Sequence, residues 1–441
     1  MSYEGLNTEK AKGFQRKVTL LSAGGTFLDG FDLTVIAVAM PLIIEQWHIG
    51  AFTQSMVEAS AIIGSFIGAI SLGNLTDKFG RKAMYIIDLL FFVVFAAVTA
   101  FSQDAIQLLI FRFLLGLGIG ADYPISATLV SEFSSDKGRG KHGTFLGAMW
   151  FVGAVTAYIF GLILEPLGDN AWRYMLLVGA VFALIIFIFR IGLPESPRWL
   201  VSKGREKEAQ EVMKQITGVD SVIPPQPEKK PKVKIRDLFS KKLIKRTIFV
   251  NVFWFCYATA YYGISMYNPT LLAQFTEGSQ TLTYIGSGTI SLIGLIGALI
   301  GLNLVDRWGR RPLLITSFAG LTIALVILAI NPTPTLIFLV ILFSIAVLFS
   351  NSGGGILNFV YPTELFPTSV RSTASGLATS VSRVGSILGV LVFPNFVAWW
   401  GAGTALWFFA VIGFIGLAVT LLLAPETKGK SLEEINEETS L

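Results

Sequence analysis

Five ionisable residues lie deep inside long apolar stretches of the sequence: Asp29, Asp32, Arg112, Asp122 and Arg383. A charged side chain costs roughly 2.5–3.5 kcal/mol at the centre of a membrane helix, so residues of this kind usually serve a function. An aspartate beside an arginine can bind and release a proton, because burial favours the neutral carboxyl and a nearby cation favours the carboxylate. The residue types therefore indicate proton and anion chemistry inside a membrane.

The depths of Asp32 and Arg112 permit an ion pair. With a helical rise of about 1.5 Å per residue, Asp32 lies about 21 Å from the cytoplasmic start of its stretch, and Arg112 lies about 12 Å from the outer start of its own stretch. Because the hydrocarbon core is about 30 Å thick, both residues lie in its outer half at similar depths. We expect proton coupling at Asp32 and Arg112, with Asp29 one turn away and Asp122 in the same relay. The alternatives are a permanent salt bridge for the pair and, for Asp122, the capping of a kink at Pro124.

Arg383 is the best indication of a substrate. It lies about 16 Å into the eleventh apolar stretch by the same rise, and its planar guanidinium suits a carboxylate or a phosphate. The alternative is that Asp29 or helix carbonyls neutralise it. Tyr and Trp combine an apolar face with one polar group. We expect such aromatic side chains and one amide to complete the substrate site: Tyr123, Trp150, Tyr257, Tyr261, Tyr262 and Asn358.

The composition requires a membrane protein. Of the 441 residues, 53% are apolar and 14% are charged, whereas a soluble domain has about 45–50% and about 25%. This excludes an ordinary soluble protein and a nucleic-acid-binding chain despite the net charge of +5. Asp88 and Glu58 lie nearer the ends of their stretches, where we expect them to be solvated or interfacial. Twelve stretches are long enough to cross a bilayer as helices: 18–44, 55–75, 83–101, 105–133, 143–164, 172–193, 246–275, 282–305, 312–330, 335–361, 372–397 and 402–424.

The charged segments set the expected domains and orientation. Apart from Arg112, Arg383 and Arg173, the 34 Lys and Arg residues lie in the even-numbered connections, at the span ends beside them or in the tails. This asymmetry predicts that both termini of a plasma-membrane protein lie in the cytoplasm. The expected parts are a tail (1–17), a six-helix bundle (18–193), a cytoplasmic linker (194–245), a second six-helix bundle (246–424) and a tail (425–441).

Three charged motifs occur once in each half at nearly one offset. Asp77 and Arg81 return as Asp306 and Arg310, Glu132 and Arg139 as Glu364 and Arg371, and Glu195 as Glu426. A repeat of this kind predicts two homologous six-helix halves, with the substrate site between them. Opposite charges at neighbouring helix ends could form ion pairs that open without unfolding. We therefore expect these ten residues to form a cytoplasmic gate, the alternative being that they only fix topology and solubility.

The motifs together resemble the major facilitator superfamily, in its branch related to sugar porters. They are the two Asp-x-x-Gly-Arg turns, Arg112-x-x-x-Gly-x-Gly-x-Gly, PESPRWL at 194–200, PTELFPTSVR at 362–371 and PETKGK at 425–430. The resemblance implies an all-α integral membrane protein of twelve helices in two pseudo-symmetric bundles, with transport by alternating access. It also implies proton coupling at Asp32, which aligns with the helix-1 aspartate of sugar porters.

The substrate indications of the resemblance differ. Sugar porters have a Gln pair in helix 7, where this chain has Cys256 and Tyr257. The segment 121–124, Ala-Asp-Tyr-Pro, is similar to phosphate–proton symporters, and helix 7 with 382–385 is similar to transporters of nicotinate-type acids. We expect proton symport of an organic acid anion or phosphate, the alternative being a monosaccharide symporter or facilitator.

No feature of the sequence favours catalysis or a cofactor. The single cysteine excludes an intrachain disulfide and a multi-cysteine metal site, and no GxxxxGK[ST] phosphate loop is present. We therefore expect no enzyme activity, cofactor, metal or nucleic acid. The expected partners are the small-molecule substrate, protons and the lipid bilayer, and the expected oligomeric state is a monomer.

Overall fold

The computed structural model describes residues 8–133, 139–218, 235–331, 334–367, 370–430 and 434–435. Twelve long helices lie within this part, which confirms the expected all-α membrane architecture. Ten stretches of the described chain, one of them spanning both α5 and α6, meet the length and hydropathy of a membrane span. The long helices are α1 (Glu9–Trp47), α2 (Ala51–Phe79), α3 (Arg81–Ala100), α4 (Ala105–Phe133), α5 (Arg139–Leu164), α6 (Ala171–Ile191), α9 (Ile244–Ala273), α10 (Gln280–Trp308), α11 (Arg310–Ile330), α12 (Leu336–Glu364), α13 (Arg371–Trp400) and α14 (Ala402–Leu423).

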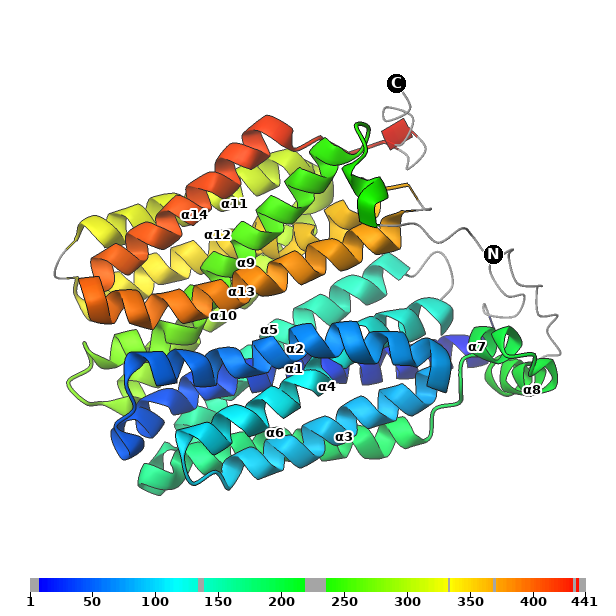
Figure 1. Cartoon of the computed structure of the whole chain (residues 1–441), viewed down its shortest axis with the longest axis horizontal. Coiled ribbons are helices and arrows are strands. Elements are labelled where there is room, and N and C mark those ends of the chain that lie inside the picture. Colours follow the sequence, from blue (N-terminus) through cyan, green and yellow to red (C-terminus); the bar gives the residue numbers. More distant parts are fainter. Residues whose placement is uncertain are drawn as a thin grey trace. The chain divides into compact units, whose positions relative to one another are not determined.

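The chain divides into two compact units. The N-terminal unit comprises 1–35, 60–157 and 170–229, and the C-terminal unit comprises 36–59, 158–169 and 230–441. In the first, α3 packs along α4 and α6, and in the second, α9 packs along α13 (Figure 1). The segments 36–59 and 158–169 come from first-half helices but contact second-half helices, so α1, α2 and α5 contribute to both units.

Glycines allow the same helix pair to pack closely in each unit. A Cβ atom added to Gly64 or Gly68 of α2 would overlap main-chain atoms of α4. In the C-terminal unit, a Cβ on Gly297 or Gly301 of α10 would overlap the main chain of α12. Small residues spaced by four let membrane helices approach at backbone distance, so this packing is part of the internal repeat.

The segment between the halves contains helices that pack on the N-terminal unit. They are α7 (Pro197–Ser202) and α8 (Glu206–Thr217). Ile216 of α8 joins an apolar cluster with Ala11 and Val18 of α1. This contact explains why α1 begins at Glu9, before its apolar stretch. Residues 219–234 of the expected linker lie outside the described part.

Candidate functional site

Asp32 and Arg112 lie together inside the N-terminal unit, joined through the main chain. The Arg112 guanidinium is fully buried, and its Nη2 donates a hydrogen bond to the backbone carbonyl of Asp32 at 3.0 Å. The Asp32 carboxyl lies against Gly179 of α6, where a Cβ would overlap Oδ1. Its Oδ2 is buried with no hydrogen-bond partner among the described residues. Asp29, one turn earlier in α1, is also buried.

Asp122 pairs with an arginine that the sequence analysis missed. Arg190 of α6 is fully buried, and its Nη1 lies 2.7 Å from Asp122 Oδ1 and 3.5 Å from Asp88 Oδ1. Asp88 is fully buried, so the expectation of a solvated or interfacial Asp88 is wrong. Arg190 looked like part of the basic flank of its helix, but the apolar residues Ile191, Gly192 and Leu193 that follow it were a signal of its depth.

The C-terminal unit brings Arg383 to a row of tyrosines. Arg383 of α13 is partly buried, and its Nη1 donates to the Tyr262 hydroxyl of α9 at 3.5 Å. Tyr262 packs edge-on against Tyr261 with ring centroids 5.5 Å apart. Tyr261 in turn stacks on Tyr257 at 5.6 Å. The Tyr257 hydroxyl donates to Asn351 Oδ1 of α12 at 3.1 Å. A guanidinium from α13, three tyrosines from α9 and an amide from α12 are thus connected by successive contacts.

Fewer contacts are described for the other expected substrate residues. Asn358 is buried two turns after Asn351 in α12. Trp150 of α5 belongs to the N-terminal unit, where its backbone carbonyl lies against Gly30. The side chain of Tyr123 lies outside the described part, as do those of the gate residues Asp77, Glu132 and Arg139.

The repeated motifs of the second half form one charged cluster. Arg310 Nη1 lies 3.1 Å from Asp306 Oδ1, and its Nη2 lies 2.9 Å from Glu364 Oε1. Glu426 accepts hydrogen bonds from the backbone N–H groups of Arg310 and Arg311, each at 3.0 Å. Arg371, at the start of α13, donates through Nε to the Phe366 carbonyl at 3.2 Å. These contacts join the ends of α10, α11, α12 and α14.

Glu195 repeats the role of Glu426 in the first half. Glu195 Oε1 accepts from the backbone N–H groups of Arg81 at 3.0 Å and Lys82 at 3.2 Å. Each glutamate therefore caps a helix, α3 or α11, that follows a glycine with positive φ, 109° at Gly80 and 98° at Gly309. A carboxylate is favourable there because the first N–H groups of a helix have no partner within the helix. The described contacts of the first-half motifs lie within the N-terminal unit, and those of the second-half motifs lie within the C-terminal unit.

Glu426 shows the electrostatic consequence of this capping. Partial burial opposes ionisation of its carboxyl, but hydrogen bonds from the backbone N–H groups of Lys428, Arg310, Arg311 and Thr427 outweigh burial and hold its pKa below the ordinary value. The Glu426 cap is therefore a carboxylate at neutral pH, as the helix terminus favours.

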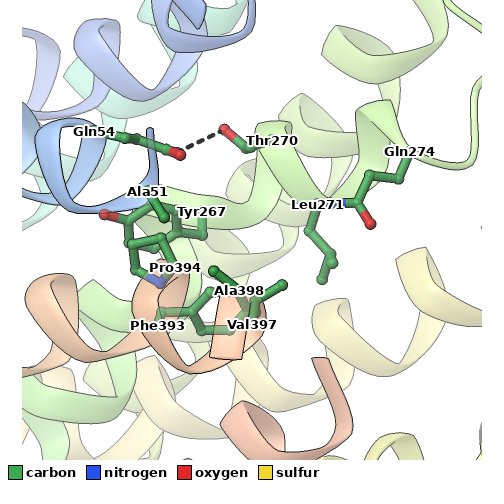
Figure 2. A pocket seen from close by; sticks show the side chains of 10 residues that line it. All are labelled: Ala51, Gln54, Tyr267, Thr270, Leu271, Gln274, Phe393, Pro394, Val397 and Ala398. Carbon is green, nitrogen blue, oxygen red and sulfur yellow. Dashed lines mark hydrogen bonds between the residues drawn. The ribbon is translucent and has the colours of Figure 1, made fainter. Parts of the chain in front are cut away.

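A cavity of about 180 Å³ lies elsewhere in the C-terminal unit (Figure 2). Gln54, from the start of α2, donates to the Thr270 hydroxyl of α9 across it at 3.3 Å. Beside it, Asn395 of α13 donates to the Ser55 hydroxyl at 3.2 Å. None of the expected substrate residues lines this cavity. Its polar contacts instead hold the start of α2 against α9 and α13.

Glu58 lies on the same stretch of α2 and was also misjudged from the sequence. The expectation of a solvated or interfacial Glu58 is wrong, because its side chain is fully buried. Gln54 Nε2 donates to Glu58 Oε1 at 3.3 Å. The misjudgement arose because segment 36–59 packs with second-half helices, a contact that linear distance from a helix end cannot reveal.

Comparisons with known proteins identify the class. The family described as sugar (and other) transporter matches residues 17–439. YaaU of Escherichia coli (strain K12), which is named for metabolite transport, is 35% identical over 98% of this chain and 96% of that protein. The niacin transporter NiaP of Acinetobacter baylyi is 28% identical over 93% of this chain and 94% of its own length.

A solved structure with the same fold is the xylose transporter XylE from E. coli in a partially occluded inward-open conformation. The match has a TM-score of 0.78 and 19% identity, and it covers 95% of this chain and 100% of that one. A second XylE structure, that of a proton:xylose symporter of the major facilitator superfamily, matches with a TM-score of 0.73 and 21% identity. The chain therefore belongs to the sugar (and other) transporter family, has the fold of that transporter structure, and is a membrane transporter, not an enzyme.

Proposed function

We propose that this transporter carries a small anion, an organic acid or phosphate, together with protons by alternating access. The observation that carries the anion assignment is the partly buried guanidinium of Arg383. Among the described residues no carboxylate forms an ion pair with it, and its hydrogen bond is to the Tyr262 hydroxyl. A cation inside a membrane span is costly without a partner, so an anionic substrate is the natural complement of Arg383.

The tyrosine row supports an acid with a flat, apolar part. Tyr257, Tyr261 and Tyr262 present ring faces and edges at centroid distances of 5.5–5.6 Å from one another. Aromatic rings pack favourably at such offsets. Arg383 would hold the carboxylate, and the Tyr257 hydroxyl with Asn351 would hold a second polar group. NiaP, named for niacin, is a relative whose named substrate has this chemistry.

The proton coupling is supported by an excess of buried negative charge. The described N-terminal unit buries four aspartates and two arginines: Asp29, Asp32, Asp88, Asp122, Arg112 and Arg190. A carboxylate without enough positive charge in a low-dielectric interior is readily neutralised by a proton. Asp32 is the expected coupling residue, because Arg112 contacts its main chain and leaves Oδ2 without a hydrogen bond.

The proposed orientation places both termini in the cytoplasm of a plasma-membrane protein. The basic turns at Gly80 and Gly309 and the basic linker support it through the positive-inside rule. Cysteine labelling in a Cys256→Ala background tests it. Lys430→Cys should react with an impermeant maleimide only after the membrane is opened, and Asp169→Cys should react in intact cells. The reverse pattern would overturn the orientation.

The contacts of the charged motifs support a cytoplasmic gate in which ion pairs and capping contacts hold neighbouring helix ends together. We propose that Asp306, Arg310, Glu364 and Glu426 keep the helix ends of the second half rigid, so that the two halves separate on this face as bodies. In the first half, Glu195 makes the corresponding contacts. Charge reversal at Asp77 should alter both the transport rate and cysteine labelling of the cytoplasmic face. Unchanged values for both would contradict the gate.

Uptake into proteoliposomes tests the function directly. An imposed proton gradient, alkaline inside, should drive accumulation of nicotinate, another small carboxylate or phosphate above the outside concentration. A protonophore should abolish it. Arg383→Gln should strongly reduce anion uptake at substrate concentrations below the wild-type KM, with Tyr174→Phe, at an exposed tyrosine of α6, as the control.

Each result decides between named alternatives. Anion uptake that is indifferent to Arg383→Gln would remove the anion contact and make that arginine structural. Accumulation of xylose alone would assign the protein to sugar symport. Saturable uptake that never exceeds equilibrium would make it a facilitator and exclude proton coupling.

A further inference from the structure

Two aspartates share one arginine in the interior of the N-terminal unit. Asp122 of α4 lies 2.7 Å and Asp88 of α3 lies 3.5 Å from Nη1 of Arg190 in α6. Asp88 Oδ2 is buried and has no hydrogen-bond partner among the described residues. All three side chains are buried. The three helices thus converge on one polar cluster that is separate from the Asp32–Arg112 contact.

The remaining polar groups around the cluster fix the arginine. The guanidinium lies 3.6 Å from the ring centroid of Tyr85. It also donates to the backbone carbonyls of Leu21, at 3.2 Å, and Tyr85, at 3.4 Å. Because main-chain carbonyls and a ring face hold Arg190, its position does not depend on both carboxylates being charged.

No further charged side chain is described facing the cluster from the elements packed around it. From α1 the neighbours are Ser22, which bonds the Tyr85 hydroxyl at 2.9 Å, and Gly25, whose added Cβ would overlap Asp122 and Arg190. Ser126 of α4 donates to Asp122 at 3.2 Å. The surrounding α5 side chains are apolar, Leu146 and Met149. The titratable groups are therefore Asp88, Asp122, Arg190 and Tyr85.

The charge balance of this cluster favours binding of one proton. Two carboxylates and one guanidinium carry a net charge of −1, and carboxylates brought together in a site cannot both remain ionised at low cost. The buried Asp88 Oδ2 has no hydrogen-bond partner among the described residues, and a protonated carboxyl oxygen can donate a hydrogen bond that a carboxylate cannot. A single proton would make the cluster neutral, with Arg190 still paired to Asp122.

We propose that Asp88 and Asp122, held by Arg190, form a second proton-binding site that takes up and releases one proton in each transport cycle. The proton comes from water on the side to which the site is open and bonds to a carboxyl oxygen of the Asp88–Asp122 pair. Arg190 is a positioning residue that keeps the pair together. This inference rests on the proposed proton coupling, to which it adds a site on α3, α4 and α6.

The test separates proton binding from transport by using Asp88→Asn. This variant leaves Asp122 and Arg190 as a neutral ion pair, so the protein should fold. Gradient-driven accumulation should be lost, while exchange of labelled for unlabelled substrate at equal pH persists. The infrared spectrum should lose one carboxylic-acid carbonyl band relative to wild type. Asp122→Asn, which leaves Asp88 with Arg190, is the second variant, and Asp169→Asn, at an exposed position, is the control.

The outcomes are distinguishable from failure of the proposed function. Wild-type accumulation by Asp88→Asn overturns the second site, even if proton coupling at Asp32 holds. If wild type shows no proton-driven uptake, the proposed function fails, and the infrared band alone decides the site. A band that is present in wild type and absent in Asp88→Asn then supports proton binding by the pair, and an unchanged band overturns it.

Discussion

Arg112 reaches Asp32 through the main chain: its Nη2 donates to the Asp32 backbone carbonyl at 3.0 Å. A guanidinium anchored in this way keeps its place when the neighbouring carboxyl gains or loses a proton. The Asp32 carboxyl can then change charge without breaking the hydrogen bond between α1 and α4. A switch of protonation at a fixed position is what coupling requires, whereas a permanent side-chain ion pair would resist it.

Asp32→Asn should therefore uncouple transport without unfolding the protein. The amide is isosteric with the protonated carboxyl and keeps the backbone carbonyl that Arg112 uses. We expect the inside concentration of substrate to rise no higher than the outside concentration under a proton gradient, with exchange at equal pH within about threefold of wild type. Asp169→Asn serves as the exposed control. Full accumulation by Asp32→Asn would exclude Asp32 from the coupling.

Arg383 should contribute to anion binding through both its charge and its planar set of donors. Arg383→Lys keeps the cation but loses bidentate geometry, and Arg383→Gln loses both. A hydrogen bond to a charged group contributes about 1.5–3 kcal/mol, so we expect the KM for an anion to rise about 10- to 100-fold in Arg383→Gln and less in Arg383→Lys.

Tyr262→Phe separates the substrate contact from support of Arg383. It removes the hydroxyl that accepts from Arg383 at 3.5 Å. A several-fold rise in KM with unchanged kcat is expected if Tyr262 only orients the guanidinium. The idea that Arg383 contacts substrate would be refuted by an equal KM for anions in wild type, Arg383→Lys and Arg383→Gln.

The sequence predicts the helices well because each membrane span must be one apolar helix, and a run of apolar residues marks it. The expected stretch 105–133 coincides with α4, for example. Partners of buried charges are harder to predict, because they depend on how each helix is rotated. From the sequence, Arg190 resembles a basic residue that flanks a membrane span. Its pairing with Asp122 can be recognised only from the packing of α4 against α6.

Packing of α10 on α12 should depend on Gly301. An added Cβ there would overlap the backbone carbonyl of Ser352, and overpacking of this kind costs about 1–3 kcal/mol. Gly301→Ala should lower the midpoint of thermal unfolding in detergent, whereas Gly376→Ala, which has open space around its Cβ position in α13, should leave it unchanged or higher. Equal effects of the two alanines would refute close packing at Gly301.

The carboxylate of Glu426 should make stability depend on pH in the acid range. Its pKa in the folded protein is lower than the ordinary value of 4.5, so its contribution is present above that value and is lost as the pH falls toward the folded-state pKa. Glu426→Gln removes the charge at the N-terminus of α11 and should cost about 0.3–1 kcal/mol at neutral pH. Thermal unfolding in detergent from pH 7 down to pH 3 measures both effects.

The difference in stability between wild type and Glu426→Gln should shrink on acidification, while Glu211→Gln, on the exposed face of α8, should follow wild type throughout. A difference that stays constant or grows as the pH falls would show that the neutral side chain, and not the carboxylate, caps the helix.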